Sequence, residues 1–145
     1  MTISPALYSS RSEDWATPQA FFDTLNAEFH FDLDAAATAE NAKCPVFIDK
    51  AVDTLASAHW VAWGKRIFCN PPYGREIGKW FAKAREAQAE GALVVMLAHA
   101  RTDTKWWHEH VQGIASEVRF VKGRLRFGDG KQSAPFPSAV IIYRP

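Results

Sequence analysis

The sequence predicts an α/β protein with a mostly parallel central sheet flanked by helices. Two observations carry this prediction: helical and strand-like periodicities alternate along the chain, and no internal repeat or long linker interrupts them. The length of 145 residues suits one domain, and a hydrophobic content of 48% is enough to bury a core. We expect a flexible N-terminal segment at residues 1–14 and a single domain at residues 15–145.

A helix is expected directly after Thr17. This residue is a favourable N-cap, and Pro18 would occupy the first helical position, where its missing N–H costs nothing. The helix would bury one aromatic face, because apolar side chains recur at helical spacing at Phe21, Phe22, Leu25 and Phe29.

From Phe29 to Asp34 the periodicity changes to two, which predicts a strand that ends in the carboxylates of Asp32 and Asp34. Ala35, Ala36 and Ala37 would then form a tight turn that lets a ligand approach the backbone. Ligands of open α/β sheets bind at the carboxyl ends of strands near a topological switch point. This end of the strand is therefore a candidate cofactor edge, although either carboxylate alone could simply be solvated.

A further acidic residue, Asp49 or Asp53, would join this edge. One carboxylate would accept hydrogen bonds from ribose hydroxyls, and another would face a positively charged part of the cofactor.

The chemically most informative motif is the run Asn70, Pro71, Pro72 and Tyr73, which follows a short apolar strand at residues 67–69. Two prolines remove two N–H donors, so neighbouring carbonyls can face a ligand instead of a ladder. The asparagine side chain and a proline carbonyl can both accept from one exocyclic amine, while the tyrosine stacks on its ring. The motif predicts a site that methylates an amine on a flat substrate, although such residues also form ordinary turns.

The second half of the chain continues the alternation. A helix is expected at residues 77–89 and ended by Gly91, and a strand buried on both faces is expected at residues 93–97. A further helix and two further strands are expected at residues 106–112, 118–121 and 139–143.

Charge is distributed unevenly along the sequence. Residues 1–60 carry 3 basic and 9 acidic side chains, a balance of −6, whereas residues 61–145 carry 14 basic and 7 acidic, a balance of +7. A basic half suits a polyanionic partner, although solvated faces would produce the same balance. The candidate nucleic-acid contacts are Arg101, Lys105, Trp106, Arg124 and Arg126.

Neither the cysteines nor the histidines have metal-ligand spacing, so no metal is expected. Cys44 and Cys69 are isolated from each other, and His108 and His110 would point to different faces of a helix. The isolated thiols indicate a reducing, cytosolic setting. No segment approaches the roughly 20 apolar residues of a membrane span.

In this order the motifs resemble the small phage-type DNA N6-adenine methyltransferases of the Dam type, from about Trp15 to Tyr143. The residues that carry the resemblance are Trp15 to Pro18, Phe31 to Ala36, Asp53 to Leu55 before Trp60, Asn70 to Tyr73, Arg101 to Thr104 with Trp106, Gly123 to Phe127, and Pro135 to Ser138.

The resemblance implies a Rossmann-like, S-adenosylmethionine-dependent methyltransferase fold without a separate target-recognition domain. It implies double-stranded DNA as the partner and the cytoplasm of a bacterial host as the location of a phage or prophage protein. The residues implied at the cofactor are Thr17, Pro18, Asp32, Asp34, Ala35, Ala36, Asp53 and Asn70, and those at the target base are Asn70, Pro71, Pro72 and Tyr73. No feature of the sequence indicates an oligomeric state.

One departure and several alternatives remain at this point. The first strand of the wider superfamily leads into a glycine-rich turn, whereas here it leads into three alanines at residues 35–37. The local chemistry of Asn70 to Tyr73 also suits methylation of cytosine N4, of an RNA guanine amine or of a protein glutamine amide. A non-catalytic nucleic-acid-binding module is a further alternative.

Overall fold

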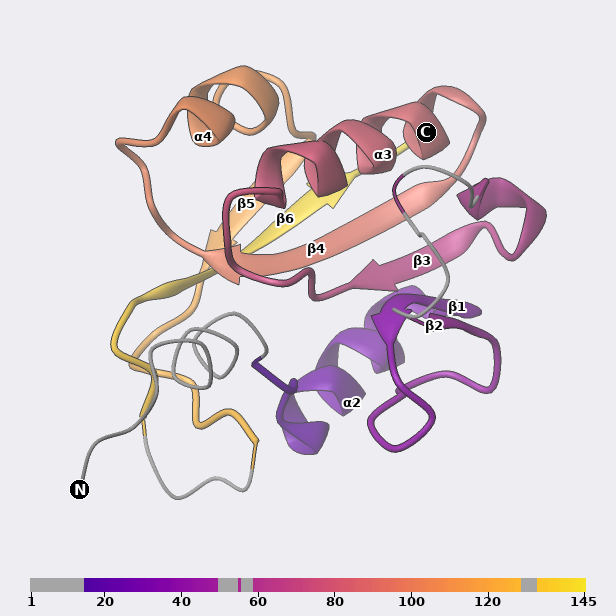
Figure 1. Cartoon of the computed structure of the whole chain (residues 1–145), viewed down its shortest axis with the longest axis horizontal. Helices are drawn as coiled ribbons and strands as arrows, with labels where there is room; N and C mark the ends of the chain where they lie inside the picture. The colour runs from indigo at the N-terminus through magenta and orange to yellow at the C-terminus, as the bar shows by residue number, and fades with distance from the viewer. Residues whose placement is uncertain (1–14, 50–54, 56–58, 129–132) are drawn as a thin grey trace.

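A mixed sheet of six strands forms the centre of the computed structural model, which describes residues 15–49, 55, 59–128 and 133–145 (Figure 1). The strand order is β2-β1-β3-β4-β6-β5. The strands are β1 (Leu33–Ala37), β2 (Phe47–Asp49), β3 (Arg66–Cys69), β4 (Leu93–His99), β5 (Glu117–Phe120) and β6 (Ser138–Tyr143). The α/β class is confirmed, and the sheet is mixed because β6 runs antiparallel to both β4 and β5, while β2, β1, β3 and β4 pair in parallel.

Helices cover both faces of this sheet: α2 (Gln19–Phe29) lies on one face and α3 (Ile77–Ala89) on the other. Cross-strand partners share a face, and neighbouring residues of a strand alternate between faces. Tyr143 pairs with Val94, whereas Phe68 pairs with the next residue of β4, so Tyr143 and Phe68 point to opposite faces. Phe81 of α3 meets Tyr143 with ring centroids 6.4 Å apart, and Phe22 of α2 meets Phe68 at 5.1 Å.

The expected strand from Phe29 onward is wrong, because Phe29 is the last residue of α2 and β1 begins only at Leu33. Phe29 belongs to the helical period and is buried with the rest of its face. The helix then ends sharply, since His30 takes a left-handed φ of 54° and its N–H donates to the Asn26 carbonyl at 2.8 Å. The Asn26 side chain accepts from the next amide, that of Phe31, at 2.8 Å.

Three other predictions for this region differ from the structure. The N-cap of α2 is Pro18, one residue after the expected Thr17. Asp32 precedes β1 and Asp34 is its second residue, so neither ends the strand. The alanines at residues 35–37 lie within β1 and are buried, where a turn was expected.

The expected helix at residues 77–89 is confirmed at both ends. The expected buried strand is also confirmed and extends to His99, and every residue of β4 before His99 is buried. The expected helix at residues 106–112 is shorter in the structure, because α4 (Lys105–His110) ends two residues early. It begins one residue early, after Thr104, whose hydroxyl accepts from the amide of Trp107. Strands β5 and β6 lie within one residue of their expected positions, whereas β2 and the 3-10 helix η1 (Trp60–Ala62) were not predicted.

The carboxyl ends of β1, β3 and β4 meet at one edge of the sheet, called the carboxyl edge below. Because β6 is antiparallel, its first residue, Ser138, also lies there, opposite His99. The chain moves outward from β1 to β2 and then returns past β1 to β3, so the switch point lies between β1 and β3. Within the described residues, no helix is both long and apolar enough to cross a membrane.

Candidate active site

A cavity of about 70 Å³ lies at the switch point, beside the carboxyl ends of the neighbouring strands β1 and β3. Five of its lining residues were expected from the sequence: Thr17, Asp34, Ala36, Asn70 and Pro71. The register explains why they meet. Asp34 pairs with Phe68, and Ala36 and Asn70 each follow two positions later on the same face.

Five other lining residues were missed by sequence reasoning: Trp15, Ala16, Asn41, Lys43 and Phe68. Asn41 and Lys43 lie in the loop between β1 and β2, and this loop could not be anticipated without β2. A signal for Trp15 and Ala16 was present, because both belong to the segment from Trp15 to Pro18 that carries the family resemblance.

The Asn70 side chain is held in one orientation by its amide nitrogen. Nδ2 donates to the Thr17 hydroxyl oxygen at 3.0 Å and to the carbonyl of Trp15. An amide nitrogen carries two hydrogens, so both are committed. The remaining polar atom, Oδ1, is buried and has no hydrogen-bond partner. The side chain is therefore fixed with one open acceptor.

Asp34 holds the loop that follows β1. Its side chain is only 3% exposed, and its two oxygens accept from the amides of Ala36 at 3.2 Å and Lys43 at 3.0 Å. The ammonium of Lys43 in turn donates to the side-chain oxygen of Gln19 at 3.0 Å, which ties the loop to α2. These two hydrogen bonds fix the start of the loop against β1.

Tyr73 is 6% exposed and lies beneath other aromatic rings. Its hydroxyl donates to the carbonyl of Leu97 at 3.1 Å, and burial raises its pKa well above the ordinary value, so the phenol stays neutral. The ring centroids of His99, Phe136 and Phe127 lie 4.7, 5.5 and 6.5 Å away. These neighbours leave little of the Tyr73 ring exposed.

Several predicted cofactor residues lie elsewhere. Asp32 lies at the opposite edge of the sheet, where its carboxylate accepts from the amides of Lys65 at 3.1 Å and Arg66 at 2.9 Å. Ala35 is buried on the other face of β1 from the cavity-lining alanine, and Pro18 caps α2 without lining the cavity.

Three further predictions concern residues near or beyond the limits of the described chain. Asp49 ends β2 and is half-buried. Asp53 and the expected flexible segment at residues 1–14 lie outside the described residues.

The four basic residues expected at DNA are all exposed and follow strands that end at the carboxyl edge. Arg101 follows β4, and Lys105 pairs with Glu109 within α4 at 3.6 Å. Arg124 and Arg126 follow β5, and Arg124 donates to the carbonyl of Ala134 at 3.4 Å.

Trp106, also expected at DNA, is half-buried and packs against the core. Its ring stacks on Phe81 of α3 at 4.9 Å and on His99 at 5.6 Å. It therefore holds α4 against α3.

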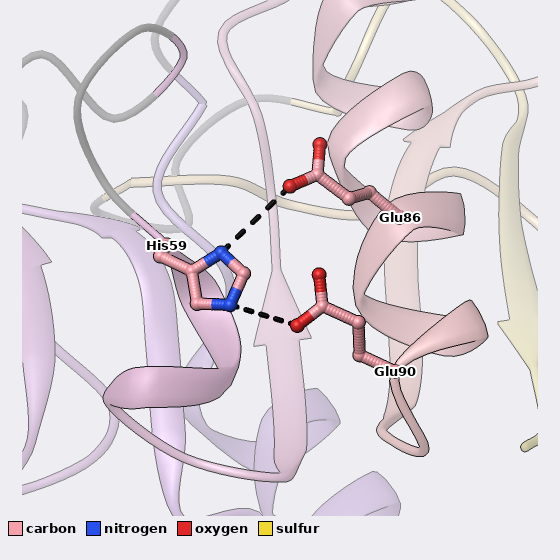
Figure 2. A group of neighbouring side chains, drawn as sticks. All are labelled: His59, Glu86 and Glu90. Atoms are coloured by element: carbon pink, nitrogen blue, oxygen red, sulfur yellow. Dashed lines mark ion pairs between the residues drawn. The ribbon is translucent and has the colours of Figure 1, made fainter.

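Figure 2 shows a separate group of exposed side chains, His59, Glu86 and Glu90, which joins η1 to α3. The Nδ1 atom of His59 lies 3.8 Å from Glu86 Oε1, and its Nε2 atom lies 2.7 Å from Glu90 Oε2. The two ring nitrogens thus face different carboxylates. This is the geometry of an imidazole that bridges two acids, and it ties η1 to the last turns of α3.

This chain is similar to two phage proteins that carry the same name. A protein of Escherichia phage T1, named DNA N-6-adenine-methyltransferase, is 31% identical over 112 residues, which cover 77% of this chain and 45% of that protein. A protein of Haemophilus phage HP1 (strain HP1c1) with the same name is 28% identical over 138 residues, which cover 90% of this chain and 78% of that protein. The matched part of this chain thus spans less than half the length of the T1 relative. The profile of the Dam family, DNA N-6-adenine-methyltransferase, matches residues 6–143, so this chain belongs to that family.

Proposed function

We propose that this chain transfers a methyl group from S-adenosylmethionine to the N6 amine of adenine in DNA. The observation that carries the proposal is the Asn70 side chain, whose amide hydrogens are both committed and whose buried Oδ1 is open. An exocyclic amine is a hydrogen-bond donor, so it complements this acceptor. Both phage relatives carry the name of this activity.

The proposed chemistry needs two acceptors for one amine. Asn70 Oδ1 and the Pro71 carbonyl would each accept one N–H, which draws the nitrogen lone pair out of conjugation with the ring so that it can attack the methyl carbon. The bond from that carbon to sulfur would break, S-adenosylhomocysteine would leave, and the methylated amine would lose one proton. Hydrogen bonds that strengthen as the nitrogen becomes tetrahedral lower the barrier instead of merely tightening binding. The target base would be flipped out of its duplex, at a cost of a few kcal/mol that Tyr73 would offset by stacking.

The residues at the switch point fit the cofactor in chemical type. S-adenosylmethionine, when bound, supplies an electrophilic methyl group on a sulfonium centre. Asp34 would accept from hydroxyls, Thr17 and Lys43 suit a carboxylate, and Ala36 leaves space beside the strand. The cavity of about 70 Å³ is smaller than the 300–1,000 Å³ typical of small-molecule sites. These residues would thus hold part of the cofactor, and the loop between β1 and β2 would open to admit the rest.

We also propose that the sheet is of the Rossmann-like methyltransferase type, with DNA as the partner at the carboxyl edge. Support comes from the switch point between β1 and β3 and from the exposed basic residues that follow β4 and β5. If Arg124 contacts a phosphate, Arg124→Ala will make the plot of log DNA affinity against log salt concentration less steep, by the slope that about one phosphate contact contributes.

The decisive experiment compares the protein with its Asn70→Ala variant. Each is incubated with labelled S-adenosylmethionine and unmethylated duplex DNA, the DNA is digested, and the methylated nucleoside is identified. We expect N6-methyladenine from the unaltered protein and a loss of at least about 100-fold in the variant, because a transition-state contact is removed. Cofactor affinity should change little.

The matched control is Gln112→Ala, which removes an exposed amide away from the cavity and should leave activity unchanged. Turnover retained by Asn70→Ala would overturn the role of this residue. N4-methylcytosine as the product would change the base alone. Cofactor binding without any transfer to DNA would favour an RNA or protein substrate.

A further inference from the structure

Two buried polar atoms near the Asn-Pro-Pro-Tyr element have no partner in the fold. They are His99 Nδ1 and Ser138 Oγ. Asn70 Oδ1 is likewise buried without a hydrogen-bond partner. In the part of the chain that the structure describes, only one other buried side-chain polar atom is without a partner, Trp60 Nε1. Buried polar atoms in native proteins are nearly always paired, so such exceptions call for a ligand or another explanation.

The three atoms come from one place in the sheet. His99 is the last residue of β4 and lies directly opposite Ser138, the first residue of β6. Opposite residues of an antiparallel pair project from the same face with their Cβ atoms close together. Asn70 follows β3, the other neighbour of β4. The His99 ring also contacts the Tyr73 ring, with centroids 4.7 Å apart.

The place beside these atoms is occupied by a ring of this chain. Phe136 is buried and meets Tyr73 at 5.5 Å and His99 at 5.6 Å, with interplanar angles of 67° and 87°. It therefore meets both rings in edge-to-face geometry. A benzyl side chain has no polar atom, so it fills the volume while leaving His99 and Ser138 unpaired. Phe136 thus marks a position that accepts a flat six-membered ring next to unused hydrogen-bonding groups.

We propose that His99 and Ser138 form the hydrogen-bonding subsite for the ring nitrogens of the target base, and that Phe136 leaves this position when the base enters. The proposal rests on the proposed function, which places the amine of that base at Asn70. A serine hydroxyl and a neutral imidazole can each donate one hydrogen bond to an aromatic ring nitrogen.

The environment of His99 keeps the imidazole neutral at physiological pH. Burial lowers its pKa from the ordinary value, and Arg101 acts in the same direction, whereas the residue's own backbone carbonyl opposes them. The neutral ring has one N–H donor to offer and carries no charge that the aromatic surroundings would have to solvate.

Two nearly isosteric substitutions test the subsite. Ser138→Ala removes only the hydroxyl, and His99→Phe keeps a flat ring against Tyr73 while it removes both nitrogens. We expect kcat/KM on adenine-containing DNA to fall about 3–10-fold in the first and about 10–100-fold in the second, with cofactor affinity unchanged. The melting temperature should stay constant or rise, because each removed atom has no partner in the free protein.

A merely structural role gives a different pattern, in which melting temperature and activity fall together. His99→Asn, which restores an N–H donor near the position of Nδ1, should recover part of the activity lost in His99→Phe.

DNA made with 7-deazaadenine or 1-deazaadenine lacks one ring acceptor. Each analogue that lacks a contacted nitrogen should slow the unaltered protein, and it should have no further effect on the variant, His99→Phe or Ser138→Ala, that has lost the donor to that nitrogen.

The control is Trp60→Phe, which removes the fourth unpaired atom; Trp60 packs against Trp80 of α3, with centroids 6.2 Å apart. It should leave kcat/KM on DNA unchanged. Unaltered kcat/KM in both Ser138→Ala and His99→Phe, with N6-methyladenine still produced by the unaltered protein, would overturn the subsite alone. Failure of the unaltered protein to make N6-methyladenine would instead overturn the proposed function.

Discussion

The polar groups at the two edges of the sheet differ in whether they have partners within the protein. At the amino edge, opposite to the carboxyl edge, Arg119 binds both oxygens of Glu28 at 2.7 Å and also bonds to Glu117, which Arg144 contacts at 2.8 Å. At the carboxyl edge, Asn70, His99 and Ser138 each retain a buried atom without a partner. The charged groups named at the amino edge are paired within the protein, whereas these three buried atoms at the carboxyl edge have no partner in it.

Cavity size alone points to the amino edge. A hollow of about 600 Å³ lies at the amino edge, bordered by Lys65, Arg66 and Arg144 among others, against about 70 Å³ at the switch point. Yet the arginines at this hollow already bond to protein groups: Arg66 Nε donates to the Phe29 carbonyl at 2.5 Å, and Arg144 pairs with Glu117. Unpaired buried polar atoms and cavity size thus point to different edges of this sheet.

The largest effect expected at the amino edge is that of Gly64→Ala. A Cβ at this position would lie 2.5 Å from Asp32 Oδ1 and 2.9 Å from Leu33 Cβ, so the chain would have to move. We expect a loss of about 2–3 kcal/mol in the free energy of unfolding, measured in urea. Methylation per folded molecule should be unchanged, and a loss of activity without a loss of stability would break the comparison between the edges.

Asp32→Ala should have a smaller effect of the same kind. The substitution deprives the amides of Lys65 and Arg66 of their acceptor, which should cost about 1–2 kcal/mol because the site is exposed. Cofactor affinity, measured by calorimetry, should not change, although the sequence had suggested this residue for the cofactor. In the Asp32→Ala background, Gly64→Ala should cost less than alone, since the nearest obstructing atom is gone. Strict additivity would contradict the contact.

Tyr73→Phe separates the two roles of a residue at the carboxyl edge. The hydroxyl is bonded to the Leu97 carbonyl, so its removal should lower the free energy of unfolding by about 1 kcal/mol. The ring remains, so methylation should stay within about twofold, whereas Tyr73→Ala should abolish it. A large loss of activity in Tyr73→Phe at unchanged stability would mean that the hydroxyl serves the substrate.

The smallest expected effect is on the decline of unfolding free energy as the pH falls. Hydrogen bonds from Arg119 and Arg144 lower the pKa of Glu117 to about 2, and Arg119 also lowers the pKa of Glu28. A lowered pKa in the folded state adds stability above the ordinary value of 4.5, and this stability is lost as the pH falls toward 2. The double variant Glu28→Gln, Glu117→Gln should therefore show a flatter decline in unfolding free energy over this range. Both groups are exposed, so the difference should be small and reduced by salt.

The sequence predicted those features that depend on local chemistry. The bounds of α3 follow from its apolar face, and β4 follows from a continuous apolar run. Asn70 is identified by the prolines beside it. The error at Phe29 arose because a helix end and a short linker happened to alternate apolar and polar residues, and only His30 marks the break.

The remaining features depend on contacts between distant parts of the chain. The covering of Tyr73 by Phe127 and Phe136 joins residues more than 50 positions apart, so no local pattern reveals it. The same is true of the pairing of His99 with Ser138 and of the tether from Asn70 to Trp15.

The position of β6 also sets the order in which the protein can become active during synthesis. This strand, at residues 138–143, lies between β4 and β5, both of which leave the ribosome earlier. Until β6 arrives, one edge of β4 has no hydrogen-bonding neighbour and is open to pairing with other chains. A nascent chain that already carries Asn70 to Tyr73 thus has the reactive motif without the strand that completes its surroundings. Residues up to Tyr143 must therefore be synthesised before the sheet beside Asn70 to Tyr73 is complete.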